Sequence, residues 1–170
     1  MSSDDLDSAA RAELRQLWAD AFGDRFDDHD ADHAYGGVHV LAYADDQIVG
    51  HASAVPRRIR IGLDWWDAAY VEAVASRPSA QRAGVGTAVM RRLHDEIDAR
   101  WPIAFLSTGR ARDFYLRLGW EVWDGPSSVL TNHGEVSTDE EHGGILVRRS
   151  PDGPDLGLPI TCEDRPGDAW

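Results

Sequence analysis

The chain has 170 residues, and 42% of them are hydrophobic, which suits one globular domain with a substantial core. Against 17 Lys and Arg stand 30 Asp and Glu, so the net charge is −13. This balance argues against nucleic acid or an anionic membrane as a partner and favours a cationic one. We expect a single domain over residues 1–170.

Neither a membrane span nor a signal peptide is expected. No apolar run is long enough to cross a bilayer, and the sequence does not open with the basic and then apolar pattern of a signal peptide. The single cysteine, Cys162, cannot form an intrachain disulfide, and we expect it to be a small semi-buried residue without a zinc site. We predict a cytoplasmic protein.

The first predicted element is an amphipathic helix over residues 7–22. Apolar residues recur there at steps of three and four, an Asp can cap its start, and Gly23 ends it. The run from Asp24 to Asp32 has too little apolar content for the core, so we expect a solvated loop. Its mixture of Asp and His also suggests a metal site, but no spacing matches a known ligand pattern, and we expect no metal.

Strands follow the first helix. Residues 38–44 and 47–56 predict a hairpin that turns at Asp45-Asp46, and residues 57–63 continue as an alternation of Arg and Ile. Residues 68–76 are small and apolar with one carboxylate, which predicts a central strand covered on both faces.

The second half of the chain alternates strands and helices. We predict a short buried strand over 103–107, then a helix over 110–118 that ends at Gly119, and a polar loop over 132–144. Further strands are predicted at 120–123, 145–148 and 158–162. This order predicts an α/β fold in which helices flank both faces of a mixed central β-sheet.

A glycine-containing loop joins the central strand to the next helix. Its glycines, Gly84 and Gly86, allow a tight turn, and the unpaired N–H groups of the first helical turn form an anion site that suits a pyrophosphate. The helix continues with apolar residues on one face and packs back onto the strand: Val85, Ala88, Val89, Leu93 and Ile97. An ordinary strand-to-helix turn has the same spacing, so the spacing alone is a weak signal.

Two motifs carry a resemblance to a known family. Gln81-Arg82-Ala83-Gly84-Val85-Gly86 resembles the acetyl-CoA loop, Gln/Arg-x-x-Gly-x-Gly/Ala, of the GNAT superfamily of N-acetyltransferases. The pattern of Ser107, Ala111, Tyr115 and Gly119-Trp120 at four-residue spacing is similar to the second GNAT signature. The resemblance implies the GNAT fold and acetyl-CoA as cosubstrate.

Four further stretches narrow the resemblance to the aminoglycoside 2′-N-acetyltransferases of actinobacteria. They are Gly36-Gly37-Val38-His39, Tyr70-Val71-Glu72, Gly125 to Leu130, and Arg165 to Trp170. The similarity runs from about Asp7 to Trp170. It implies acetyl transfer to the 2′-amino group of these antibiotics, which confers resistance, and it implies a homodimer.

Acetyl transfer needs a neutral amine, a polarised carbonyl and a protonated leaving thiolate. Glu72 is the candidate base, because burying an unpaired carboxylate in a strand is costly and needs a reason. Regular alternation would place it on one face with Tyr70 and Val74. Tyr115 is the candidate acid, because its ordinary pKa of about 10 lies above that of a thiol. The alternatives are a structural partner of an arginine for Glu72 and a core aromatic for Tyr115.

The resemblance also assigns binding residues. It implies that the cosubstrate contacts Val74, Ala75, Ser76, Gln81, Arg82, Ala83, Gly84, Val85, Gly86 and Thr87. It implies that the aminosugar contacts Asp24, Asp30, Glu72, Ala73, Ser107, Glu141, Asp168 and the carboxylate of Trp170. The position that the family pattern assigns to Asp24 could instead match Arg25. The binding role assigned to Glu141 could instead belong to Asp139 or Glu140.

Two other functions remain open at this point. The chain could acetylate another amine, such as a polyamine, a cell-wall amino sugar or a peptide, because the fold alone does not fix the acceptor. It could also be a non-catalytic domain that binds a cation or CoA, although both Glu72 and Tyr115 are present.

Overall fold

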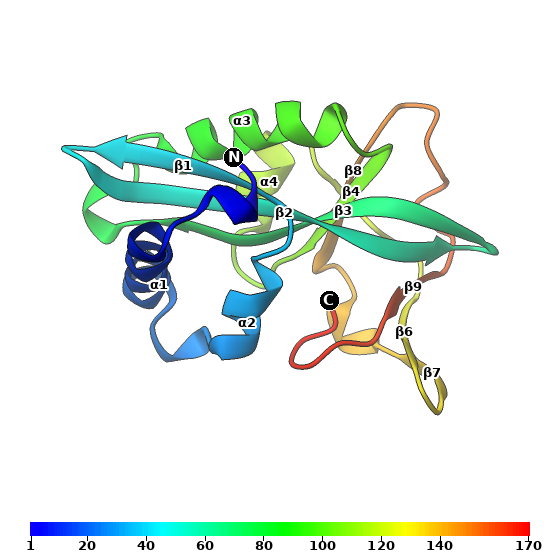
Figure 1. Cartoon of the computed structure of the whole chain (residues 1–170). Helices are drawn as coiled ribbons and strands as arrows, with labels where there is room; N and C mark the ends of the chain where they lie inside the picture. The colour runs from blue at the N-terminus through cyan, green and yellow to red at the C-terminus, as the bar shows by residue number, and fades with distance from the viewer. The chain divides into compact units, whose positions relative to one another are not determined.

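The computed structural model describes residues 1–170 and divides them into two compact units (Figure 1). The first unit comprises residues 1–55 and 71–99, and the second comprises residues 56–70 and 100–170. Two long strands, β2 (Gln47–Ile61) and β3 (Asp64–Ser76), contribute residues to both units. A single domain over residues 1–170 stays a prediction.

In the first unit, α1 (Ser8–Phe22) forms where the sequence predicted it. The carboxylate of Asp7 accepts a hydrogen bond of 2.8 Å from the Ala10 N–H and caps the start of the helix. Gly23 ends it with φ at 60°, a conformation that glycine adopts at little cost. A short helix, η1 (Ser3–Asp5), precedes α1.

The predicted acidic loop is largely helical, which corrects the sequence-based expectation. It forms η2 (Gly23–Arg25) and α2 (Asp28–His33). Asp27 caps α2 through the N–H groups of His29 and Asp30, and the Asp30 carboxylate in turn accepts from the Asp27 N–H. This capping box and one buried residue, Ala31, are sufficient to order a short polar helix.

A hairpin separates two layers of helix in the first unit. Strand β1 (Val38–Ala44) pairs antiparallel with β2, from Val38 opposite Ala54 to Ala44 opposite Gln47. A Cβ atom at Gly50 would lie 2.4 Å from Val85 in α3 (Val85–Asp98), so this helix packs directly on β2. Figure 1 shows α3 on one side of β1 and β2 and α1 with α2 on the other. Helices therefore cover both faces of these strands.

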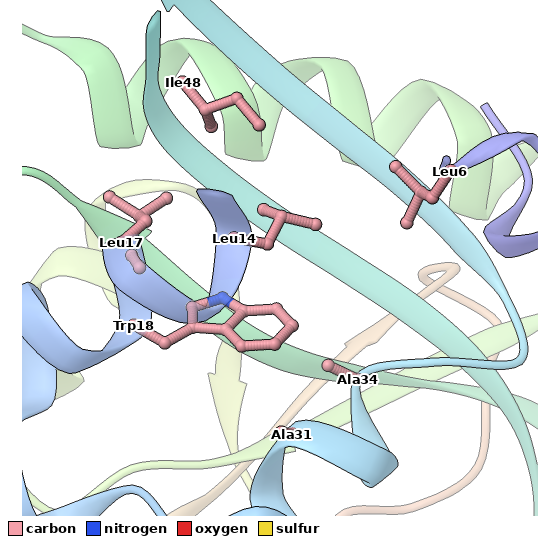
Figure 2. Packing of buried hydrophobic residues seen from close by; sticks show 8 residues of the cluster. Leu6, Leu14, Leu17, Trp18, Ala31, Ala34 and Ile48 are labelled. Carbon is pink, nitrogen blue, oxygen red and sulfur yellow. The ribbon is translucent and has the colours of Figure 1, made fainter. Parts of the chain in front are cut away.

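The side of the hairpin that faces α1 carries an apolar cluster (Figure 2). Leu14, Leu17 and Trp18 of α1 are fully buried, because the three- and four-residue spacing places them on one face. The cluster is completed by Leu6, Ala31, Ala34, Ile48 and Ala75.

In the second unit the strands follow the order β5-β8-β4-β3-β2-β9-β6-β7. Strands β3 and β4 are parallel, as are β6 and β9, while β4 and β8 are antiparallel, which confirms the predicted mixed sheet. The remaining elements of this unit are β4 (Ile103–Ser107), α4 (Arg112–Arg117), β5 (Glu121–Val122), β6 (Ser127–Thr131), β7 (Gly134–Ser137), η4 (Asp139–Glu141), β8 (Ile145–Arg149) and β9 (Ile160–Glu163).

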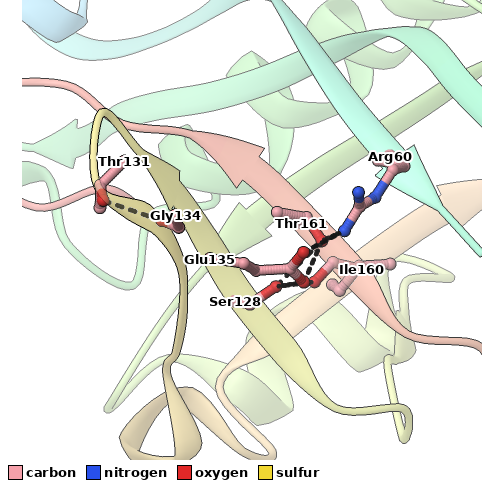
Figure 3. A network of polar contacts seen from close by, with 7 residues as sticks. All are labelled: Arg60, Ser128, Thr131, Gly134, Glu135, Ile160 and Thr161. Carbon is pink, nitrogen blue, oxygen red and sulfur yellow. Dashed lines mark hydrogen bonds and ion pairs between the residues drawn. The ribbon is translucent and has the colours of Figure 1, made fainter.

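The predicted loop over 132–144 contains strand β7 and the helix η4, which is a second correction. The exposed strand β7 is held by a polar network (Figure 3). Glu135 accepts hydrogen bonds from Ser128 at 2.6 Å, Arg60 at 2.5 Å and Thr161 at 3.0 Å. The bonds from Ser128 and Arg60 lower the pKa of Glu135. Side-chain bonds between strands thus order a hairpin that lacks apolar alternation.

Candidate active site

The loop predicted to bind the cosubstrate leads from β3 into α3 in the first unit. It passes through the short helix η3 (Pro78–Ala80), and Gly84 stands at the N-cap of α3 with φ at 84°. No side chain caps this helix, and a Cβ atom at Gly84 would meet nothing within 4 Å. The start of α3 therefore offers backbone N–H groups beside open space, which suits a phosphate group.

Arg77 anchors the start of this loop, and the sequence reasoning missed it. Its Nε donates 2.8 Å to the Ile48 carbonyl, and its guanidinium pairs with Asp20 of α1 at 2.9 Å. The Arg77 backbone N–H also donates to Val49. An arginine directly after a strand and before a proline was the only signal in the sequence.

The backbone of strand β3 is irregular at Ala73, the residue that follows Glu72. Ala73 has φ at 50°, a left-handed conformation that is unusual for a residue with a side chain. We call Glu72 and Ala73 the β3 kink. The kink interrupts the regular alternation that was expected to place Glu72 on one face with Tyr70 and Val74. Glu72 is also half-buried, whereas the sequence suggested a fully buried carboxylate.

Two side chains of β2 bond to the carbonyls of the β3 kink. The Nδ1 atom of His51 lies 2.8 Å from the Ala73 oxygen, and Ser53 Oγ donates 3.2 Å to the Glu72 oxygen. Side chains of β2 thus supply hydrogen-bond partners to both carbonyls.

In the second unit, Ser107 and Glu141 come together as a pair. Ser107 ends β4, and its hydroxyl donates 2.7 Å to the Glu141 carboxylate. Asp139 instead accepts from Ser137 Oγ at 2.5 Å. Of the three competing acids, only Glu141 is seen to bond to a residue that was predicted to bind substrate.

The segment over residues 163–170 is held against the second unit. Trp170 is 6% exposed, and its indole N–H donates 3.1 Å to Thr138 Oγ1. The Asp168 backbone carbonyl accepts a hydrogen bond of 2.8 Å from Arg165 Nε, and the Asp168 carboxylate is not involved in that bond. These contacts fix the backbone that carries both predicted binding residues.

Tyr115 lies in α4 of the second unit and is 7% exposed. Its ring meets Trp120 edge-on at 6.2 Å between centroids and Phe114 at 5.1 Å. Burial raises the pKa of Tyr115, because the phenolate would lose its hydration. The hydroxyl is therefore protonated at neutral pH and can act as a donor.

The remaining predicted residues lie at the surface of the first unit. Asp24 and Asp30 are exposed, and Asp30 uses one carboxylate oxygen in the capping box of α2. Arg25 is exposed next to Asp24, so burial does not distinguish the two. No group of three or more His, Cys, Asp or Glu side chains is placed to hold a metal ion. None of the helices combines the length and the apolar character needed to cross a membrane.

The chain is similar to known acetyltransferases. The family model described as an acetyltransferase (GNAT) domain matches residues 4–123. An aminoglycoside 2′-N-acetyltransferase of Mycolicibacterium fortuitum is 36% identical over 171 residues, which cover 98% of this chain and 88% of that protein.

Solved structures share the fold at low identity. A GNAT family acetyltransferase from Brucella melitensis, in complex with acetyl-CoA, matches with a TM-score of 0.61 and 18% identity over 90% of both chains. An aminoglycoside 6′-N-acetyltransferase complexed with coenzyme A matches with a TM-score of 0.62 and 14% identity, over 89% of this chain and 97% of that one. With its mixed sheet, its flanking helices and its glycine loop, the chain belongs to the GNAT family of acetyltransferases.

Proposed function

We propose that the protein transfers the acetyl group of acetyl-CoA to the 2′-amino group of aminoglycoside antibiotics and thereby confers resistance to them. As a GNAT protein it is an acetyltransferase that uses acetyl-CoA. The observation that carries the choice of acceptor is the 36% identity, over 98% of the chain, to an aminoglycoside 2′-N-acetyltransferase.

The chemistry assigns a task to each candidate catalytic residue. The Glu72 carboxylate takes a proton from the substrate ammonium, directly or through water, and leaves a neutral amine. The amine nitrogen attacks the thioester carbon, and the carbon–sulfur bond breaks as the Tyr115 hydroxyl gives its proton to the departing thiolate. The nitrogen sheds its extra proton to water as the amide forms, and Tyr115 regains a proton from water. The Tyr115 hydroxyl is protonated, as a donor must be, while burial raises its pKa and so makes the proton harder to release.

The acceptor is a polycation, and the charge of the chain supports this. Carboxylates recognise ammonium groups through charge-assisted hydrogen bonds, and the net charge of the chain is −13. Glu141 supports the proposal most directly, because the Ser107 hydroxyl fixes its carboxylate at 2.7 Å. Asp24, Asp30, Ala73, Asp168 and Trp170 complete the proposed set of binding residues.

The pyrophosphate and pantetheine of the cosubstrate are proposed to lie along the end of β3 and the start of α3. The first-turn N–H groups after Gly84 bind the phosphates, and the glycine admits them closely. The proposed contacts are Val74, Ala75, Ser76, Gln81, Arg82, Ala83, Gly84, Val85, Gly86 and Thr87.

Regiochemistry tests the proposal. A 2′-amino aminoglycoside and its 2′-hydroxy counterpart are incubated with acetyl-CoA, and the products are analysed by mass spectrometry and NMR. We expect one acetyl group on the 2′ nitrogen of the first compound and none on the second. Equal acetylation of both would contradict the 2′ assignment but not the acetyltransferase activity.

Two further measurements test the proposal: the salt dependence of antibiotic binding and the turnover of Glu72→Gln. Apparent affinity for the antibiotic should weaken as salt rises, since ion pairs are screened. Glu72→Gln should reduce turnover most below neutral pH, where the free amine is scarce. A peptide or polyamine that is acetylated faster than any aminoglycoside would favour a different acceptor.

The cytoplasmic location and the homodimer stay predictions from the sequence. Light scattering of the purified protein would measure whether it is a dimer.

A further inference from the structure

A line of buried polar groups in the first unit runs from Ser3 to the β3 kink. Ser3 Oγ lies 2.7 Å from His39 Nε2, and His39 Nδ1 lies 2.9 Å from His51 Nε2. His51 Nδ1 then lies 2.8 Å from the Ala73 carbonyl oxygen. His39 is 1% exposed and His51 is fully buried, so water does not compete for these contacts.

The carbonyl at the end of this line indicates the direction of its hydrogen bonds. A carbonyl oxygen only accepts, so the 2.8 Å contact to Ala73 assigns a proton to His51 Nδ1. His51 Nε2 is then an acceptor, and His39 Nδ1 must donate to it. His39 Nε2 accepts in turn, and the Ser3 hydroxyl donates to it. This assignment makes both imidazoles neutral Nδ1–H tautomers.

The contacts of Ser3 are compatible with this direction. Its oxygen accepts from the backbone N–H groups of Gly36 at 2.9 Å and Gly37 at 3.1 Å, and its hydroxyl has two acceptors, His39 Nε2 at 2.7 Å and the Gly37 carbonyl at 3.3 Å, of which His39 is the nearer. Burial lowers the pKa of both histidines, so neither takes a second proton near neutral pH.

Trp18 lies against the same histidine. Its indole N–H approaches His51 Nδ1 at 3.2 Å, with the two ring planes inclined at 68°. The Trp18 N–H and the Ala73 carbonyl therefore both approach His51 Nδ1, and the shorter contact, 2.8 Å to the carbonyl oxygen, favours a proton on Nδ1. The Trp18 ring also restricts the orientation of the His51 imidazole.

We propose that His51, oriented by His39 and Ser3, is a positioning residue of acetyl transfer that holds the β3 kink in its left-handed conformation. Ser53 supports the same kink through the Glu72 carbonyl. The kink carries Glu72, so the hydrogen bond from His51 fixes the backbone from which the proposed base projects. This step depends on the role of Glu72 in the proposed function.

Two substitutions at His51 test the proposal. His51→Leu fills the space but leaves the buried Ala73 carbonyl without a donor, whereas the side-chain amide of His51→Asn keeps a donor near the Nδ1 position. We expect His51→Leu to lower kcat roughly 10- to 100-fold per folded molecule, with less effect on the KM for acetyl-CoA. His51→Asn should restore most of the rate.

Ile48→Ala is the matched control, because Ile48 is also fully buried in the first unit but its side chain makes no polar contact with the kink. It should lower stability and leave the kcat of the folded fraction near wild type. A purely structural role for His51 predicts the same behaviour for His51→Leu, and that result would overturn the proposal.

NMR provides a readout that does not need turnover. Long-range ¹H–¹⁵N spectra of the full chain at pH 7 should show Nδ1–H tautomers for both His39 and His51. An Nε2–H tautomer at His51 would overturn the proposal, even if His51→Leu does not fold. Wild-type protein that acetylates no aminoglycoside would contradict the proposed function, whereas active wild type with an equally active His51→Leu contradicts only the positioning role.

Discussion

The hydroxyl of Ser107 donates a 2.7 Å hydrogen bond to the carboxylate of Glu141, although 34 residues separate the two in the sequence. The bond distinguishes Glu141 from its two acidic neighbours, of which Asp139 bonds instead to Ser137. A carboxylate fixed in this way is ready to accept an ammonium group without further ordering.

Glu141→Gln should therefore raise the KM for a 2′-amino aminoglycoside by about tenfold, because a charge-assisted hydrogen bond is replaced by a neutral one. Steady-state kinetics at fixed acetyl-CoA measure the effect. Asp139→Asn is the control and should stay within about twofold of wild type, as exposed charges contribute little. An equal rise for both variants would mean that the whole acidic turn attracts the substrate without a specific contact.

Gly84 provides a test of the cosubstrate loop. Gly84→Asp adds a negative charge where phosphates are proposed to bind, so CoA binding should be lost in calorimetry. Gly84→Ala controls for shape. A Cβ atom there meets nothing within 4 Å, and the variant bears only the cost of φ at 84°, about 1 kcal/mol. Unchanged CoA affinity in a folded Gly84→Asp would remove the loop from the site.

The buried histidines make stability depend on pH. Burial lowers the pKa of His39 to about 4 and of His51 to about 3, from an ordinary value of 6.5. Below pH 6.5 the unfolded chain therefore binds more protons than the folded one, and the free energy of unfolding falls as pH decreases. At pH 5 the loss is about 2 kcal/mol for each histidine.

Urea denaturation at pH 7, 6 and 5 measures this loss, and no histidine contribution to it should appear above pH 7. The double variant His39→Gln, His51→Asn removes both titrating groups, so its stability should change less over the same range. A wild-type stability that stays constant from pH 7 to pH 5 would show that the two imidazoles become charged without unfolding.

Tyr115→Phe should lower kcat by about tenfold or more, with little change in either KM, since only the hydroxyl is lost. Burial raises the pKa of Tyr115, so ionisation of this group should not reduce the wild-type rate up to about pH 10. Rate profiles from pH 6 to pH 10 for both proteins provide the comparison. A variant as fast as wild type throughout would leave Tyr115 as a core aromatic.

Elements with their own periodicity could be predicted from the sequence. The apolar spacing of α1, the hairpin pattern of β1 and the short apolar run of β4 gave bounds within one residue of those observed. Strands β6 and β7 were missed, because β6 begins with two serines, β7 is exposed along its length, and Glu135 of β7 is ordered by partners on other strands. Helix α2 was missed because it buries almost no apolar surface.

The candidate site likewise has one part that a local sequence motif predicts and another that it does not. The loop proposed to bind the cosubstrate was predicted from a local motif with a tight turn at its glycines, and Gly84 adopts a left-handed conformation there. The β3 kink does not follow from sequence, because no local pattern marks Ala73 for a positive φ, and the side chains that contact the kink, His51 and Ser53, come from another strand. His51 and Ser53 lie about 20 residues before the kink in the sequence. In the sequence, neither residue differs from what is usual in a strand.

Arg57 ties residues 163–170 to the second unit, and this contact also has no signature in the sequence. Its guanidinium donates 2.5 Å to the Ala169 carbonyl and 2.8 Å to the Glu163 carbonyl. The same group stacks over the Tyr70 ring at 5.0 Å. One planar fork therefore holds both ends of the segment that carries Asp168 and Trp170.

Arg57→Lys keeps the charge but loses the fork, since an ammonium cannot reach two carbonyls in fixed geometry and stack on a ring at once. We expect the segment to loosen, the KM for the aminoglycoside to rise about fivefold to tenfold, and the KM for acetyl-CoA to stay unchanged. Hydrogen exchange of the backbone over 163–170 should accelerate in parallel. Arg58→Lys is the matched control, because that guanidinium lies 5.0 Å from the Trp65 ring. If Arg57→Lys accelerates exchange without raising the aminoglycoside KM, residues 163–170 do not contribute to substrate binding, and Asp168 and Trp170 leave the proposed set.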